Sequence, residues 1–347
     1  MSSNVNASPL AGQPAGSEPA GHSTRSTKRG IGYFAEAYAL VLLLALIAIF
    51  FSVWPQTSDT FPTLGNLQIL LGNQAVIGIV ALGALIPLIA NEWDLSIGAM
   101  AGVTSIVTAL MLSNGLGLLL SPLMGLALGV GIGGVNALIV TKFGVNGVIT
   151  TLGMATLLEG VTNQLTGGLA ITTDIPDVIV ELGIGRWLGI PKVIFILAAV
   201  ALLVAYVLGH TPFGRYLYAI GANPSAAKLV GIRVQYVVAA AFVCSGFLAA
   251  TGGILSVARQ AGADPRIGVG LTLPALAAAF LSAASIRPGK YNVGGVIVAI
   301  FFLAVLNNGL ALAGVPAYVS SYVNGAALIV GVGLAAYLGR RRSGQGV

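Results

Sequence analysis

Residues 117–141 read GLLLSPLMGLALGVGIGGVNALIVT and contain no Asp, Glu, Lys or Arg. A helix needs about twenty apolar residues to cross the hydrocarbon layer of a membrane. This stretch is longer than that and has no charge to keep it in water. It therefore predicts a membrane-spanning helix.

Similar apolar segments recur along the chain, separated by short polar breaks. The predicted spans are 35–53, 74–90, 96–113, 117–141, 146–166, 192–209, 236–256, 271–285, 291–313 and 318–338. The segments 96–113 and 271–285 are short for a membrane span. The pattern predicts an all-α, polytopic membrane protein with about ten transmembrane helices.

The composition agrees with this fold class. Of the 347 residues, 56% are hydrophobic and 7% are charged, whereas a soluble domain carries roughly 25% charged residues. The 48 glycines suit membrane helices, which approach closely through small residues. One cysteine and two histidines exclude an intramolecular disulfide and a metal cluster built on soft ligands, and no cofactor motif is found.

The basic residues predict the orientation. If the N-terminus is cytoplasmic, 12 of the 16 Lys and Arg residues fall in cytoplasmic segments and 4 fall outside. Both termini are then cytoplasmic. The basic residues are scattered rather than gathered in a stripe, so nucleic acid is not expected as a partner.

Three regions follow from these patterns. Residues 1–30, rich in Ser, Gly, Pro, Ala and Thr, are expected to be a disordered cytoplasmic tail. Residues 31–340 form the transmembrane domain, and 341–347 a second cytoplasmic tail. The external loop 167–191 is expected to hold a short amphipathic element.

The cytoplasmic loop 210–235 carries signals for a short helix. Asn223 is a good N-cap, Pro224 suits the first helical position, and Gly231 can supply a left-handed stop after Val230. So short a helix is not stable alone in water, so it must rest on the membrane domain or on a partner. It is interpreted as a docking helix for a cytoplasmic protein, with an ordinary interhelical loop as the alternative.

Several motifs resemble one family. Residues 214–232, GRYLYAIGANPSAAKLVGI, resemble the coupling loop of the ribose/xylose/galactose-type permeases of bacterial ABC importers. Residues 93–98 (WDLSIG), 305–310 (VLNNGL), 150–153 (TTLG) and Asn136 are similar to further motifs of that family. The resemblance spans about residues 35–340. The chain departs from the pattern at 146–149 (NGVI) and 282–290 (SAASIRPGK), so the solute is not carried over from the best-known members.

The resemblance implies the permease subunit of an ATP-driven importer that moves a monosaccharide or related polyol across the bacterial cytoplasmic membrane. Its implied partners are a cytoplasmic ATPase, an extracytoplasmic sugar-binding protein and a second permease copy or paralogue. The implied ATPase-coupling residues are Gly221, Asn223, Pro224, Ala226, Ala227, Lys228 and Gly231. The chain itself is not expected to be an enzyme, because its one Gly-Lys pair, Gly289-Lys290, lacks the remainder of a P-loop.

A path for a polar solute needs hydrogen-bonding groups within the membrane. The candidates are Asp94, Ser96, Asn136, Thr150, Thr151, Asn163, Asn307 and Asn308. Asparagines in membrane helices also bond neighbouring helices, and Asp94 is placed to cap the helix that follows it. Both interpretations stay open for these residues.

Two further patterns bear on mechanism. Glu159 is the acidic residue well inside a predicted span, which leaves a proton-coupled secondary transporter as the alternative function; a Glu159→Gln change would then abolish uptake. Asn136-Ala-Leu followed by Gly144-Val145 resembles Asn308-Gly-Leu followed by Gly314-Val315. Since these segments would run in opposite directions, the echo indicates an inverted repeat.

Overall fold

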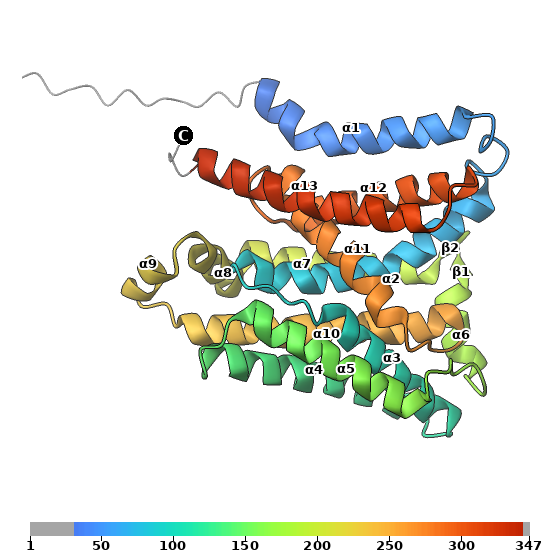
Figure 1. The fold of residues 1–347 in the computed structure, drawn as a ribbon, viewed down its shortest axis with the longest axis horizontal. Helices are drawn as coiled ribbons and strands as arrows, with labels where there is room; N and C mark the ends of the chain where they lie inside the picture. The colour runs from blue at the N-terminus through green and yellow to red at the C-terminus, as the bar shows by residue number, and fades with distance from the viewer. Residues whose placement is uncertain (1–30, 343–347) are drawn as a thin grey trace, which may run out of the picture.

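The computed structural model describes residues 31–342, so the predicted tail 1–30 and residues 343–347 lie outside it. The fold is all-α apart from one hairpin of two short strands (Figure 1). In chain order the elements are α1 (Ile31–Val53), α2 (Leu64–Ile89), α3 (Ile97–Ser113), α4 (Leu120–Thr141), α5 (Gly147–Thr166), α6 (Asp177–Ile184), β1 (Arg186–Trp187), β2 (Ile190–Pro191), α7 (Lys192–His210), α8 (Pro212–Ala222), α9 (Pro224–Leu229), α10 (Val234–Gln260), α11 (Ile267–Leu281), η1 (Ser282–Ala284), α12 (Val293–Leu312) and α13 (Tyr318–Arg342).

Each of the predicted segments coincides with a helix of the structure. Within the described residues, 7 helices are long and apolar enough to cross a membrane: α2, α4, α7, α10, α11 with η1, α12 and α13. The residues 37–53 of α1 and the helix α3 are shorter apolar helices. The chain is therefore a polytopic membrane protein. α5 has 20 residues, as α12 has, but it is not among these seven helices because its Thr, Glu, Asn and Gln residues make it less apolar.

α2 begins at Leu64, ahead of the predicted start at residue 74. Its N-cap is Thr63, whose hydroxyl accepts a hydrogen bond from the amide of Asn66 at 3.3 Å. The first turns contain polar residues, and Gln68 is buried because its amide donates to the carbonyl of Gly189 in the hairpin at 2.8 Å. A hydropathy pattern misses these turns because a tertiary hydrogen bond, not lipid, accommodates their polar side chains.

The centre of the molecule is a set of closely packed helices. α2 and α10 run antiparallel: Gly83 of α2 lies against Ser245 and Leu248, and Gly72 lies against Arg259 near the other end of α10. α4 packs on the opposite side of α10 through Gly129. A Cβ on Gly129 would collide with Ala250 and the backbone of Gly246, and a Cβ on Gly83 or Gly72 would crowd α10, which explains part of the high glycine content.

Two segments share the same order of elements. α2 and α10 each end in a non-helical break, at residues 90–96 and 261–266, and each break is followed by a short helix, α3 or α11, and then by two longer helices. Asn91 and Ala261 both have left-handed backbone conformations, with φ of 66° and 51°. The carboxylates of Asp94 and Asp264 accept hydrogen bonds from the amides two residues on, at 3.1 and 2.8 Å.

The corresponding positions are 170 residues apart throughout, from Asn91 and Ala261 to Gly98 and Gly268. Those two glycines meet where the first turns of α3 and α11 cross. A Cβ on Gly268 would lie 2.9 Å from the carbonyl oxygen of Gly98, and a Cβ on Gly98 would collide with Gly268 and Thr272. The crossing therefore depends on the absence of side chains at both positions.

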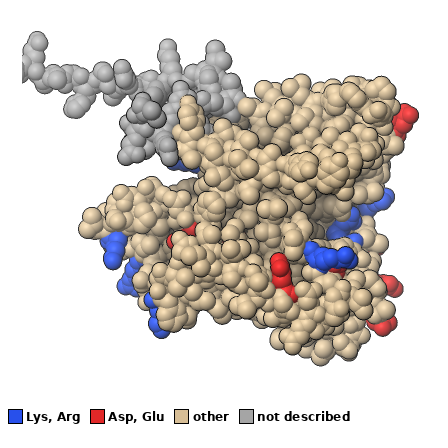
Figure 2. Space-filling model, viewed as in Figure 1, with Lys and Arg blue, Asp and Glu red and all other residues tan. Residues whose placement is uncertain are grey.

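The polar connections lie at two opposite ends of the helices. Figure 1 shows α8 and α9 at one end and α6 with the β1–β2 hairpin at the other. Figure 2 shows coloured charged side chains gathered mainly toward these two ends, with a largely uncharged band between them. This is the distribution that a membrane-spanning body requires.

The crossing of α3 and α11 can be tested with Gly98→Ala. The added methyl group would force the two helices apart, so the free energy of unfolding should fall by about 1–3 kcal/mol, a typical overpacking cost. Thermal unfolding of the purified protein in detergent measures it. Gly153→Ala in α5 is the matched control, because that position opens onto free space. Equal melting temperatures for the two variants would contradict the described crossing.

Candidate functional site

α8 holds the connection between α7 and α10 against the membrane domain. Its buried residues Leu217 and Ile220 face the core, and Gly221 lies directly against the backbone of Ile89 at the end of α2. The Tyr218 hydroxyl donates to the carbonyl of Tyr291 at 2.8 Å. Residues 212–222 are thus a helix within the predicted loop 210–235, and their sequence signal is the helix start formed by Thr211 and Pro212.

α9 has the geometry that the sequence predicted. The side-chain oxygen of Asn223 accepts a hydrogen bond from the amide of Ala226 at 3.0 Å, and Pro224 occupies the first turn. Gly231 follows the helix with φ of 85°, a conformation that glycine adopts without strain. Ala227 is buried, so it holds α9 against the rest of the chain rather than facing outward.

The outward face of α9 is apolar. Leu229 is 89% exposed and Val230 is 78% exposed, and Lys228 is exposed beside them. A groove of about 520 Å³ adjoins them, lined by Pro224, Ser225, Lys228 and residues 231–236. We call Lys228, Leu229, Val230 and this groove the α9 surface. Lys228 is one of the predicted coupling residues, whereas Leu229 and Val230 are not. The sequence feature that identifies Leu229 and Val230 is a pair of large apolar residues at the end of a helix outside the membrane.

A second polar site is buried where the break 90–96 meets α10 and α4. One carboxylate oxygen of Asp94 accepts hydrogen bonds from the hydroxyl of Ser96 at 2.6 Å and from its amide at 3.1 Å. The other accepts from the hydroxyl of Ser245 at 2.7 Å. The Asn136 amide donates to the Ser96 hydroxyl at 2.9 Å. All four residues are buried, and we call them the Asp94 network.

Thr151 of α5 satisfies the backbone of the same break. Its hydroxyl accepts from the amide of Leu95 at 3.0 Å and lies 3.2 Å from the carbonyl of Trp93 and 2.8 Å from that of Gly147. The structure thus brings together four of the predicted path residues, Asp94, Ser96, Asn136 and Thr151. It also adds Ser245, which nothing in the sequence distinguished from the other serines.

The remaining candidates lie elsewhere. Asn308 and Asn66 exchange two amide hydrogen bonds of 2.9 and 3.0 Å between α12 and α2, and Asn307 donates to Asn324 of α13 at 3.2 Å. Thr150 is buried at the start of α5, whereas Asn163 is exposed further along that helix, as is Glu159. Their role in a solute path stays a prediction.

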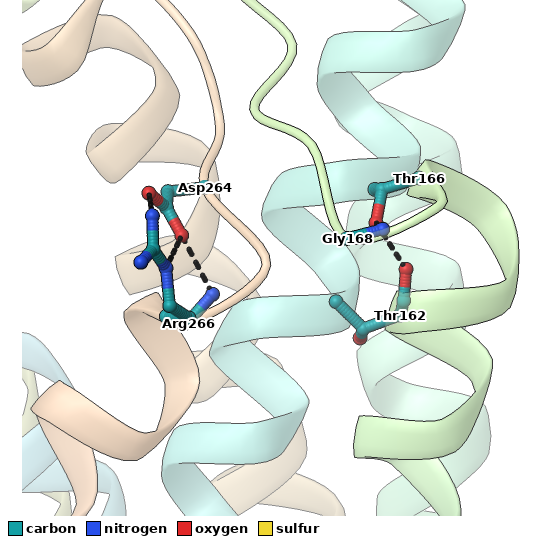
Figure 3. Close-up of polar contacts among 5 residues, drawn as sticks. All are labelled: Thr162, Thr166, Gly168, Asp264 and Arg266. Atoms are coloured by element: carbon teal, nitrogen blue, oxygen red, sulfur yellow. Dashed lines mark hydrogen bonds and ion pairs between the residues drawn. The ribbon is translucent and has the colours of Figure 1, made fainter.

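The counterpart of Asp94 is arranged differently. Asp264 forms an ion pair with Arg266 at 3.2 Å near the surface, and hydrogen bonds from Arg266 lower the pKa of its carboxyl group (Figure 3). Of the two breaks, only the first is therefore tied by its carboxylate to the helices of the core.

Figure 3 also shows the end of α5, where the Thr166 hydroxyl donates to the carbonyl of Thr162 and accepts from the amide of Gly168.

These features define a class of protein: a polytopic membrane protein with a short, exposed helix at one end. The family model of branched-chain amino acid transport system permease components matches residues 66–332. The chain belongs to this family, and it is therefore a transport component rather than a catalytic subunit.

Curated relatives agree with the family. The chain is 36% identical over 317 residues to the ribose import permease protein RbsC of Escherichia coli (strain K12), which covers 89% of this chain and 98% of that protein. It is 33% identical to RbsC of Haemophilus influenzae, over 89% and 96% of the two chains. The autoinducer 2 import system permease protein LsrC of Photorhabdus laumondii is 32% identical, over 85% and 87%. No solved structure matches the chain.

The Asp94 network can be tested with Ser245→Ala. Removing a hydroxyl that donates to a buried carboxyl group should lower the free energy of unfolding by about 1.5–3 kcal/mol. Thermal unfolding in detergent is the measurement, with Thr251→Ala on the same helix as the control, because that hydroxyl is exposed and bonds only to its own helix. A Ser245→Ala protein as stable as the control would show that α10 does not hold the break through this bond.

Proposed function

We propose that this chain is the membrane-spanning permease of an ATP-driven importer that moves a monosaccharide or related polyol across the bacterial cytoplasmic membrane. The observation that carries the proposal is an exposed apolar docking helix on a chain whose relatives are named as permeases for ribose and autoinducer 2 import. This chain supplies the solute path and the helix α9, which transmits motion to that path, and another subunit supplies ATP hydrolysis.

We also propose that ten helices cross the membrane with both termini cytoplasmic. The seven long apolar helices, together with α1, α3 and α5, give the even number that this topology needs. The bias of 12 to 4 in Lys and Arg places α8 and α9 on the cytoplasmic side.

The same proposal includes an inverted repeat of α2–α5 and α10–α13. Its support is the matching order of elements, the antiparallel directions of α2 and α10, and the correspondence of Asn91, Asp94 and Gly98 with Ala261, Asp264 and Gly268. In many transporters such repeats rock against each other to alternate access.

The α9 surface is the proposed docking site for the cytoplasmic ATPase. Leu229 and Val230 are apolar anchors that a partner would cover, and Lys228 beside them can pair with an acidic group. α9 is fixed to the membrane domain through Ala227 and through α8. Closure of an ATPase dimer would therefore displace α8, α9 and the start of α10 together.

A second permease copy or paralogue would complete the solute path. α5 and α13 lie at the edge of the helix assembly, with Leu157 and Ile329 exposed by 68% and 74%. Asn163 is exposed on α5, so it is available to a solute held between two copies. At the opposite end from α9, the exposed acidic residues Asp174, Asp177 and Glu181 are a proposed docking region for an extracytoplasmic sugar-binding protein.

The docking proposal can be tested with Leu229→Asp. A charge in the middle of an apolar anchor should weaken association with the ATPase subunit at least tenfold, since a buried apolar anchor contributes roughly 2 kcal/mol or more to an interface. Co-purification with the cognate ATPase subunit measures the association, and membrane insertion should be unchanged.

Leu188→Asp is the matched control for this experiment. Leu188 is 87% exposed, so the two substitutions are the same in chemistry and exposure, but it lies in the hairpin at the opposite end. Retained ATPase binding by both variants, or its loss in both, would contradict docking through α9.

The energy source has its own prediction. In vesicles that hold the complete complex, uptake should require ATP and should persist when an ionophore removes the proton gradient. Uptake by this chain alone, driven by that gradient and abolished by Glu159→Gln, would instead establish the proton-coupled alternative.

A further inference from the structure

A pocket of about 430 Å³ lies between the end of α7, the start of α8 and the start of α12. Its lining includes Tyr206 and His210 of α7, Tyr218 of α8, Arg287 of the loop after η1, and Gly294 of α12. The proposed function uses none of these groups. The pocket is polar beside His210 and Arg287, where the helices end, and apolar along α7. It therefore has two chemically different halves.

The polar half is cationic. Arg287 is exposed, and it forms no ion pair with any carboxylate whose position the structure describes. No Asp or Glu lines the pocket. His210 stacks on Tyr206 with ring centroids 5.3 Å apart and an interplanar angle of 13°, so the imidazole is held at the mouth of the pocket.

Backbone amides add to this positive potential. The side-chain oxygen of Asn292 caps α12 by accepting from the amide of Gly295 at 2.7 Å. The amides of Val293 and Gly294, which line the pocket, have no acceptor within the described chain. A helix start with free amides, beside a guanidinium group, favours an anion such as a phosphate group.

The apolar half continues onto the surface of α7. Leu202 lines the pocket and is 72% exposed, and Leu203 next to it is 58% exposed. α7 is one of the helices that are long and apolar enough to cross the membrane, and most of its surface is uncovered by the rest of the chain. This wall therefore faces lipid, and an acyl chain lying along it would start at the phosphate-binding half.

We propose that this pocket binds an anionic phospholipid, with its phosphate group between Arg287, His210 and the start of α12 and an acyl chain along α7. A free phosphate ion would use only the polar half, whereas a phospholipid uses both. The position fits as well, because His210 is the last residue of α7 and the pocket therefore lies at the membrane boundary. Basic pockets between transmembrane helices are a known form of headgroup site.

The proposal predicts a preference for phosphatidylglycerol over phosphatidylcholine that depends on Arg287. The full-length protein is purified, exchanged into mixtures of the two lipids and analysed for bound lipid by native mass spectrometry. Arg287→Gln should reduce the phosphatidylglycerol preference about fivefold, the effect of one basic group near an anionic lipid. Arg287→Lys should retain most of it.

Lys142→Ala is the control, because Lys142 is an exposed basic residue after α4 that does not line the pocket. Leu202→Gln separates the two sources of phosphate: it should weaken binding of phosphatidylglycerol and leave binding of glycerol 1-phosphate unchanged. If Arg287→Gln is too unstable to purify, weaker binding of phosphatidylglycerol by Leu202→Gln alone still tests the site.

Three results would overturn the proposal. They are an unchanged lipid preference in Arg287→Gln, an equal loss in Lys142→Ala, and glycerol 1-phosphate binding as tightly as the lipid. None of these readings depends on uptake or on the ATPase, so the lipid site and the proposed transport function can fail separately.

Discussion

The fold depends on how the backbone is satisfied where it leaves helical geometry inside an apolar body. In such surroundings an unpaired amide or carbonyl costs several kcal/mol, so irregular backbone survives only where protein groups replace the missing partners. In the break after α2, the Asp94 carboxylate accepts from the amide of Ser96, and the Thr151 hydroxyl accepts from the amide of Leu95. Ser245 then anchors that carboxylate to α10. The short helix α3 can start in the interior because of these bonds.

Features set by local chemistry were predictable from the sequence. Only long apolar segments can lie against lipid, so hydropathy located the seven long apolar helices and the shorter apolar helices α1 and α3. It did not locate α8, whose apolar residues face the core on one side only. The short helix after Asn223 followed from capping, because an Asn, a Pro and a Gly at those spacings restrict the backbone directly. The resemblance in the loop 214–232 led to the same family that the comparison with residues 66–332 shows.

Features set by distant contacts were not predictable. The bond from Ser245 to Asp94 joins residues 151 positions apart, and no local pattern separates Ser245 from other serines. The polar start of α2 needs the hairpin that accepts from Gln68. Ala227 matched the expected coupling motif, yet it faces inward, and the exposed apolar residues are Leu229 and Val230. Burial depends on which side of α9 meets α8, and a helix of six residues is too short to show an amphipathic period.

The two breaks are alike in backbone and unlike in their side-chain contacts, and this difference bears on how motion would travel. Asp264 pairs with Arg266 near the surface, so its carboxylate does not bond to a core helix, and the second break is held instead by the backbone pairing of Ala263 with Ile171. Asp94 is bonded to α10, and α10 starts a few residues after α9. Under the proposed function, a displacement of α9 therefore reaches α10 through the short link 230–233. From α10 it reaches the first break through Ser245, α4 through the backbone contact of Gly129 with Gly246, and α2 through the packing of Gly83 against Ser245 and Leu248. Under that proposal, α9 and the buried carboxylate are parts of one connection, because tightly packed helices shift as units rather than deform.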